Sequence, residues 1–270
     1  MKRVRERIFM TLAIIVQARA GSSRLPGKVL EPLGAASVLA RVLARCRRLE
    51  GLDDLVCAVP DSAGNDAVAA EAKACGAHVV RGSETDVLSR YADAARAVGA
   101  DEVVRVTSDC PFFDPEVCRQ VVALLRESGA DYANNTMIAG FPQGLDCEAF
   151  PAELLFKAER QAKAPANREH VTAWMRRQHA VSMACLRGPG GDAGALRWTL
   201  DYPEDLDFCR AVFERLGDAR AAWVDYPKLA ALCRSTPELA AINAAHADPS
   251  RASVAAAASI VRDYTFPQAD

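Results

Sequence analysis

The sequence predicts an α/β protein in which a mostly parallel sheet lies between two layers of helices. Short apolar segments typical of buried strands alternate with amphipathic segments at helical spacing over roughly the first 130 residues. Polar residues follow directly after several of these strands, and open α/β sheets bind ligands at that edge. We therefore expect right-handed strand–helix–strand connections and a three-layer, Rossmann-like architecture.

The first half of the chain contains the clearest elements. We expect strands over 12–16, 55–59, 79–80 and 103–107, and helices over 38–46, 66–76, 87–98 and from 115 onward. The run 12–16 is apolar throughout, as in a strand buried on both faces. Ser37 and Asp114 are suitable N-caps, and Pro115 suits a first helical position. Gly76 and Gly99 end two of the helices, because glycine readily adopts the left-handed conformation found there.

The second half of the chain is less regular. We expect turns over 139–144, helices over 151–163 and 167–178, strands over 181–186 and 196–200, a helix over 203–216, and a loosely docked helix or tail from 249 onward. A glycine-rich turn at 188–191 separates the two strands. We divide the chain into an N-terminal extension (1–10), a single domain (11–246) with an insertion at about 135–195, and a C-terminal tail (247–270).

The composition excludes several classes of protein. Half of the 270 residues are hydrophobic and a quarter are charged, which disfavours disorder and coiled coils. The formal net charge is -2, so the chain lacks the basic excess of a nucleic-acid binder. A phosphate-bearing partner would need a local basic site, which favours a small nucleotide over a polymer.

The cysteines and the N-terminus bear on the compartment. The nine cysteines include no C-x-x-C pair, so they predict buried thiols in a reducing compartment, which we take to be the cytoplasm, rather than disulfides or zinc ligands. Basic residues before the apolar run 8–16, followed by Ala18-Arg19-Ala20, permit a signal peptide as an alternative. The same run also fits a first buried strand, which we favour. No apolar run is long enough for a membrane helix, and we expect no membrane association.

A basic loop follows the first strand. Arg19, Arg24 and Lys28 lie within ten residues and alternate with glycine and serine. Small residues let backbone N–H groups approach an anion, while the cations neutralise its charge. The loop lacks the spacing of a Walker motif. It therefore predicts a polyphosphate site of another kind, and a solvated basic turn is the alternative.

Two carboxylates occupy comparable positions after later strands. Asp109 follows the strand 103–107, and Asp201 follows the strand expected at 196–200. Two carboxylates facing a triphosphate suit Mg²⁺, which takes one or two protein carboxylates together with phosphates and waters. Each aspartate also fits the simpler role of helix cap or turn residue. Asp114, directly before Pro115, is interpreted as a cap.

Six motifs point to a known family. They are IIVQARAGSSRLPGK, DVLSRY, RVTSDCPFFDPE, FPQGLDCEAF, REHVT and TLDYPEDL, and they span residues 14–208. Together they resemble the cytidylyltransferases that activate acidic sugars, namely the CMP-Kdo and CMP-acylneuraminate synthetases, and especially the branch named after spore coat polysaccharide biosynthesis protein F. The resemblance implies a nucleotide-sugar-transferase (GT-A-like) fold, CTP as substrate, an acidic sugar as acceptor, Mg²⁺ as cofactor and a homodimer.

The resemblance also implies roles for individual residues. The residues implied to bind the nucleotide are Ala18, Arg19, Gly21, Ser22, Ser23, Arg24, Lys28, Asp86, Arg105 and Asp109. The residues implied to bind the metal are Asp109 and Asp201. The residues implied to bind the acceptor are Gln143, Asp146, Glu148, Arg168 and His170, with Glu169 beside them. Arg19, Lys28, Asp109 and Asp201 are the implied catalytic set. The insertion at 135–195 would build the acceptor pocket or a dimer contact. His170 also fits an ordinary helix residue. The acidic Asp146 and Glu148 would repel a sugar carboxylate unless they bind hydroxyls, an amine or a second Mg²⁺.

The expected reaction is an in-line attack of a sugar hydroxyl on the α-phosphorus of CTP, with pyrophosphate leaving. Such chemistry depends mainly on positioning and charge neutralisation. One alternative is a GT-A-type glycosyltransferase that uses a nucleotide sugar. Its usual Asp-x-Asp motif occurs here only at 205–207, inside an expected helix, which disfavours it. A non-catalytic nucleotide-binding protein is the second alternative, disfavoured by the intact Lys28, Asp109 and Asp201.

Overall fold

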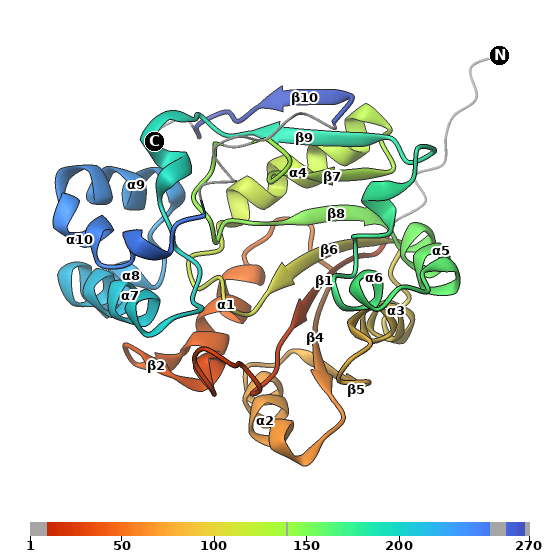
Figure 1. Cartoon of the computed structure of the whole chain (residues 1–270), viewed down its shortest axis with the longest axis horizontal. Helices are drawn as coiled ribbons and strands as arrows, with labels where there is room; N and C mark the ends of the chain where they lie inside the picture. The colour runs from red at the N-terminus through yellow and green to blue at the C-terminus, as the bar shows by residue number, and fades with distance from the viewer. Residues whose placement is uncertain (1–9, 139, 249–257, 268–270) are drawn as a thin grey trace.

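The computed structural model describes residues 10–138, 140–248 and 258–267 (Figure 1). Its centre is an eight-stranded sheet in the order β10-β9-β7-β8-β6-β1-β4-β5, which runs from β10 at the top of Figure 1 to β5 lower in the view. The strands are β1 (Leu12–Gln17), β4 (Asp54–Pro60), β5 (His78–Gly82), β6 (Glu102–Thr107), β7 (Tyr132–Asn134), β8 (Glu148–Pro151), β9 (Met183–Arg187) and β10 (Ile260–Asp263). All neighbours pair in parallel except β8, which is antiparallel to both β6 and β7. The predicted mostly parallel α/β fold is confirmed.

Two hydrophobic cores lie on the two faces of this sheet. Strand β1 contributes to both, because successive side chains of a strand point to opposite faces: Leu12, Ile14 and Val16 to one core, Ala13 and Ile15 to the other. The first core packs against α1 (Val38–Cys46), α2 (Asp66–Ala74), α4 (Pro115–Ser128), α7 (Pro203–Leu216) and α9 (Tyr226–Ser235). The second packs against α3 (Val87–Ala97) and α5 (Ala152–Gln161). The continuous apolar run of β1 is thus explained by burial on both faces.

Local sequence signals place the ends of most helices correctly. Ser37 Oγ accepts a hydrogen bond from the Ala40 amide at 3.0 Å and caps α1. Asp114 caps α4 by accepting from the amides of Glu116 and Val117, which confirms its interpretation as a cap. Gly76 and Gly99 follow α2 and α3 in the left-handed region, with φ of 75° and 62°.

Two predictions between residues 167 and 200 are wrong. Instead of one helix over 167–178, α6 (Pro165–Glu169) ends early and a separate 3-10 turn covers Met175–Arg177, because Val171 takes a positive φ of 46°. Residues 196–200 form no strand. They pass beside residue 143 with a single bridge, Gln143 to Arg197. Gly144 permits this approach, since a Cβ there would lie 2.6 Å from the Thr199 amide nitrogen.

Three short strands of the eight-stranded sheet were not predicted, and one of them changes the description of the C-terminus. Strands β7 and β8 insert between β6 and β9, and β10 extends the sheet beside β9. Residues 260–263 are therefore an edge strand rather than a loose helix or tail, and the rest of that prediction, at 249–257, lies outside the described residues. The other described strands form a small ribbon of β2 (Pro32–Leu33) with β3 (Ala36–Ser37), and the other described α-helices are α8 (Asp218–Ala221) and α10 (Pro237–Ala241). Short 3-10 helices cover Lys28–Leu30, Ala63–Asn65, Gly191–Ala195 and Ala244–His246.

The apolar run near the N-terminus forms the central strand β1, between β4 and β6. The basic residues that a signal peptide would use belong to 1–9, which lie outside the described residues. Among the described residues, no helix combines the length and the apolar character needed to cross a bilayer.

Candidate active site

A pocket of about 270 Å³ opens at the carboxyl ends of β1 and β6. The loop that follows β1 forms one wall, the start of α3 another, and the segments after β6 and before α7 the floor. The lining residues are Gln17, Ala18, Arg19, Gly21, Ser22, Ser23, Arg24, Lys28, Val29, Val87, Arg90, Arg105, Thr107, Ser108, Asp109, Glu169, His170 and Asp201. The parallel register of β1 and β6, which pairs Gln17 with Thr107, brings the basic loop beside Asp109. This is the edge at which the sequence predicted ligand binding.

Lys28 joins the two predicted metal-binding carboxylates. Its ammonium Nζ lies 2.9 Å from Asp109 Oδ2 and 2.9 Å from Asp201 Oδ1, and it donates to the Leu200 carbonyl at 2.7 Å. Only 11% of the Lys28 side chain is exposed, compared with 26% for Asp109 and 19% for Asp201. Three residues that are far apart in the sequence thus form one compact ionic cluster at the pocket floor.

This cluster alters the ionisation of its members. Burial alone would raise the pKa of the Asp109 carboxyl, but the Lys28 ammonium and local hydrogen bonds lower that pKa below its usual value. Burial would likewise lower the pKa of Lys28, and the two facing carboxylates instead raise it. Both carboxylate and ammonium are therefore held in their charged forms.

Asp201 is positioned by a buried group one helical turn further along the chain. The Asp205 carboxylate is fully buried and accepts from the amides of Asp201 and Tyr202 at 2.8 and 2.9 Å. It also pairs with the Arg197 guanidinium, at 2.7 Å from Nε and 2.8 Å from Nη2, and accepts from Asn243 at 2.9 Å. Asp205 is hence a structural residue at the start of α7, and the Asp-x-Asp triplet it begins does not face the pocket.

The two remaining loop cations differ in their partners. Arg24 donates to Tyr202 Oη at 3.0 Å, lies 3.3 Å from Asp201 Oδ1, and stacks over the Tyr202 ring. Tyr202 in turn stacks on His246, with 3.8 Å between ring centroids. Arg19 is exposed, and no hydrogen bond or ion pair joins its side chain to another described residue. Arg19 is the loop cation most available to an incoming anion.

The predicted acceptor residues separate into two groups. His170 and its neighbour Glu169 line the pocket. Gln143 and Asp146 do not: Gln143 accepts instead from Arg197 at 3.0 Å. Arg168 lies outside the lining as well, and it pairs with Asp86, another predicted site residue.

Glu148 is 5% exposed and lies behind the pocket rather than in it. It binds the Arg105 guanidinium at 2.6 Å and accepts hydrogen bonds from the Tyr132 and Thr172 hydroxyls. Burial would raise the pKa of the Glu148 carboxyl, but Arg105 and these donors lower it. Glu148 thus has no free oxygen directed at an acceptor, and the repulsion expected from it does not apply.

Arg90 and Tyr202 are two residues at or beside the pocket that were not predicted from the sequence. Arg90 lies on α3, lines the pocket and donates to the carbonyls of Ser83 and Glu84. Its position three residues after Val87, on the helix that begins beside the pocket, was the available signal. Tyr202 directly follows Asp201, and only its contact with Arg24 reveals its place in the site.

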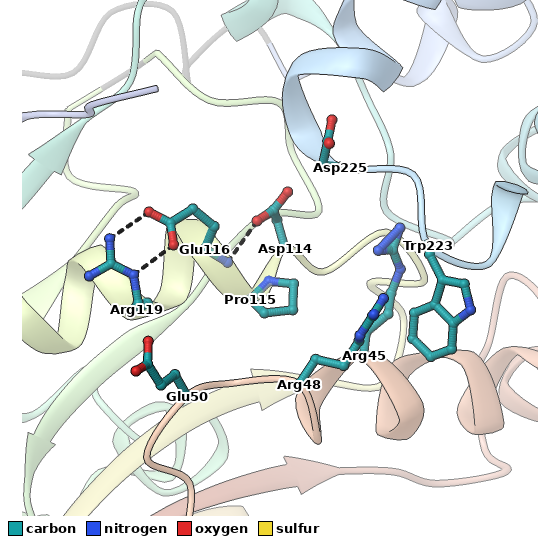
Figure 2. A pocket seen from close by; sticks show the side chains of 9 residues that line it. All are labelled: Arg45, Arg48, Glu50, Asp114, Pro115, Glu116, Arg119, Trp223 and Asp225. Atoms are coloured by element: carbon teal, nitrogen blue, oxygen red, sulfur yellow. Dashed lines mark hydrogen bonds and ion pairs between the residues drawn. The ribbon is translucent and has the colours of Figure 1, made fainter. Parts of the chain in front are cut away.

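A second, separate pocket of about 310 Å³ lies between the end of α1 and the start of α4. Figure 2 shows the side chains that line it. Most of its charged side chains already form ion pairs or hydrogen bonds within the protein. Arg119 pairs with Glu116, Asp114 caps α4 and binds the Tyr226 amide, and Asp225 caps α9. None of its lining residues belongs to the first pocket. The cluster around Lys28 is therefore the stronger candidate for the active site.

A basic glycine–serine loop after β1, one carboxylate after β6 and a second just before α7, all at one edge of an α/β sheet, are typical of a nucleotidyltransferase. A family model described as cytidylyltransferase matches residues 13–192, well over half of the chain. The chain therefore belongs to the cytidylyltransferase family, and it is a CTP-dependent nucleotidyltransferase.

Individual relatives agree with this assignment. The chain is 35% identical over 214 residues to the spore coat polysaccharide biosynthesis protein SpsF of Bacillus subtilis, covering 77% of this chain and 88% of the relative. It is 34% identical over 125 residues to a 3-deoxy-manno-octulosonate cytidylyltransferase of Anaeromyxobacter, covering 45% and 49%. A solved cytidylyltransferase from Leptospira borgpetersenii superposes with a TM-score of 0.78 at 28% identity, covering 86% of this chain and 97% of that one.

Proposed function

We propose that this protein transfers CMP from CTP to a hydroxyl of an acidic sugar, in a Mg²⁺-dependent reaction that releases pyrophosphate. The observation that carries the proposal is the ionic cluster, in which Lys28 lies 2.9 Å from both Asp109 and Asp201 beside the basic loop. Cytidylyl transfer needs charge neutralisation around a triphosphate and precise positioning of the acceptor. The cluster and the loop offer the first, and the wall formed by Glu169 and His170 offers the second.

The donor set fits a magnesium ion. Asp109 and Asp201 supply two carboxylates that already share one cation, and no group of three or more His, Cys, Asp or Glu side chains suited to a metal occurs among the described residues. Mg²⁺ is commonly held by one or two protein carboxylates, with phosphates and waters completing its shell. Asp109 and Asp201 would hold it. Bound there, Mg²⁺ would neutralise phosphate charge and polarise the α-phosphate.

The loop residues have distinct tasks in this proposal. Arg19 and Arg24 bind the β- and γ-phosphates, together with the backbone amides of residues 21–23. Lys28 moves from the carboxylates toward the phosphates, where it stabilises the charge that develops on leaving pyrophosphate. Ala18 follows β1 and lets the backbone approach the nucleotide closely.

The acceptor enters from the side of Glu169 and His170. His170 is the group placed to accept the proton of the attacking hydroxyl or to bind the sugar carboxylate. One relative of this chain is named for spore coat polysaccharide biosynthesis, and another is a 3-deoxy-manno-octulosonate cytidylyltransferase. They support an acidic sugar destined for a surface polysaccharide. We further propose a cytoplasmic homodimer, and analytical ultracentrifugation tests the dimer.

Pyrophosphate release with Mg²⁺, four nucleoside triphosphates and a panel of acidic sugars tests the proposal. The panel includes 3-deoxy-manno-octulosonate, its 8-amino derivative and N-acetylneuraminate. Release with CTP and one sugar would establish the reaction and its acceptor. Absence of release, combined with tight binding of a nucleotide sugar, would instead favour the glycosyltransferase alternative.

A further inference from the structure

The pair Glu169–His170 lies between two anchoring contacts, one on each side in the sequence. On the N-terminal side, Arg168 Nε donates to Asp86 Oδ2 at 2.9 Å, and Arg168 Nη1 donates to the Glu159 carbonyl at 2.6 Å. Asp86 is itself fixed as the cap of α3, accepting from the Ser89 amide at 2.9 Å. This contact ties the end of α6 to the helix that forms one wall of the nucleotide pocket.

On the C-terminal side the chain makes an unusually tight turn. Val171 has a φ of 46°, the only positive φ among the described non-glycine residues, and the Thr172 amide donates to the His170 carbonyl at 2.5 Å. Such a three-residue turn is strained, most of all for a β-branched residue. The Val171 side chain is completely buried in the second hydrophobic core. A strained backbone persists where the surrounding packing holds it in place.

Thr172 connects this turn to Arg105, another residue of the pocket lining. Its Oγ1 donates to Glu148 Oε1 at 2.8 Å, while Glu148 Oε2 binds Arg105 Nη1 at 2.6 Å. The antiparallel register of β6 and β8 pairs Arg105 with Glu148. Arg105 lines the pocket and also donates to Gln17 at the end of β1, at 3.3 Å. A continuous set of contacts therefore runs from the His170 turn to the nucleotide side.

We propose that Thr172 and Glu148 are positioning residues, which hold His170 on the acceptor side of the pocket in a fixed arrangement relative to Arg105 on the nucleotide side. Neither residue lines the pocket, so neither touches the substrates. Thr172 is 1% exposed and Glu148 5%, and their mutual hydrogen bond is shielded from water. Loss of that bond leaves the turn dependent on its packing alone, and His170 then samples other orientations. This inference rests on the proposed function, because it assigns His170 to the acceptor.

The substitution Thr172→Val tests it, since valine keeps the shape of the side chain and removes only the hydroxyl. We expect kcat with the accepted sugar to fall about 10- to 100-fold, because small misplacements of reacting groups slow a reaction by such factors. The Kd for CTP should stay within about twofold. Thr172→Ser restores the hydroxyl and should recover at least half of the lost kcat. A kcat unchanged by Thr172→Val, or an equal loss of CTP affinity, would overturn the proposal.

Thr236→Val serves as the matched control, because Thr236 is also buried but lies between α9 and α10, away from the pocket. It should leave kcat unchanged. Hydrogen–deuterium exchange of the segment 168–174 provides a readout that needs no acceptor: Thr172→Val should accelerate exchange about tenfold, and Thr172→Ser should not. If exchange of this segment is unaltered in Thr172→Val, the proposal that the Thr172–Glu148 hydrogen bond holds the turn in place is refuted. A wild-type protein that binds CTP but releases no pyrophosphate would refute the proposed function instead.

Discussion

Replacing Lys28 by methionine separates binding of the triphosphate from binding of the nucleoside. Methionine keeps most of the volume of a side chain that is 11% exposed, and it removes the ammonium that bridges Asp109 and Asp201. If Lys28 moves to the β- and γ-phosphates, the variant loses a charge-assisted hydrogen bond worth about 1.5–3 kcal/mol. That range corresponds to a weakening of CTP affinity by about 10- to 150-fold. CMP lacks both phosphates, so its Kd should change by no more than about threefold.

Isothermal titration of both nucleotides in the presence of Mg²⁺ measures this difference directly. Lys73→Met is a suitable control, since Lys73 is exposed on α2 and far from the pocket lining. Circular dichroism of the variant checks that the fold is intact. Equal losses of CTP and CMP affinity in a folded Lys28→Met protein would refute the assignment of Lys28 to the terminal phosphates.

Three further predictions concern the carboxylates. Asp201→Asn should abolish pyrophosphate release while leaving the thermal midpoint within a few degrees, whereas retained turnover would remove Asp201 from the metal site. Asp205→Ala should destabilise the fold by about 3–5 kcal/mol in urea titrations, because it removes the buried carboxylate that binds two nitrogens of the buried Arg197. In the folded protein the pKa values of the Asp109 and Glu148 carboxyls are lowered. The stability that these two ionised groups contribute is therefore present above about pH 5 and is lost as the pH falls through their folded-state pKa values. Thermal melts from pH 6 to 3 should show a declining midpoint.

The parts of the fold that the sequence predicted well are those in which local and tertiary preferences agree. The strand 12–16 is apolar throughout because both of its faces are buried. Asp114 and Pro115 mark the start of α4 because they satisfy its first amides locally. The same agreement holds for the basic loop, whose spacing and position after β1 are features of the sequence itself.

The errors lie where distant contacts determine the local conformation. Val171, Trp174 and Met175 recur at helical spacing and are all buried, yet α6 ends at Glu169. Packing of Val171 and the Thr172–Glu148 hydrogen bond impose a turn that residue preferences disfavour. Strand β8 was not predicted either, because its conformation also depends on a contact with a residue distant in the sequence.

Glu148 at the start of β8 is unfavourable in a buried strand unless a partner neutralises its charge. The register places it opposite Arg105, and the pair neutralises both charges inside the protein. Sequence reasoning assigned the two residues to different substrates, since their pairing depends on a strand order that the local pattern does not contain. The same holds for Asp86 and Arg168, which were assigned separately and bind each other.

Asp201 contacts three cationic side chains, and these differ in their other contacts within the protein. Arg197 is 5% exposed and bound through two nitrogens to the buried Asp205, so it stays in place when ligands bind. Lys28 and Arg24 both line the pocket and reach Asp201 from the loop that would surround the phosphates. Their two positive charges keep Asp109 and Asp201 from repelling each other before the nucleotide arrives. In the proposed reaction, Mg²⁺ held by Asp109 and Asp201 would take over that neutralisation, and the side chains of Lys28 and Arg24 would then be free to bind phosphate. If the proposed function is right, the complete Mg²⁺–CTP pair would thus bind more favourably than either component alone.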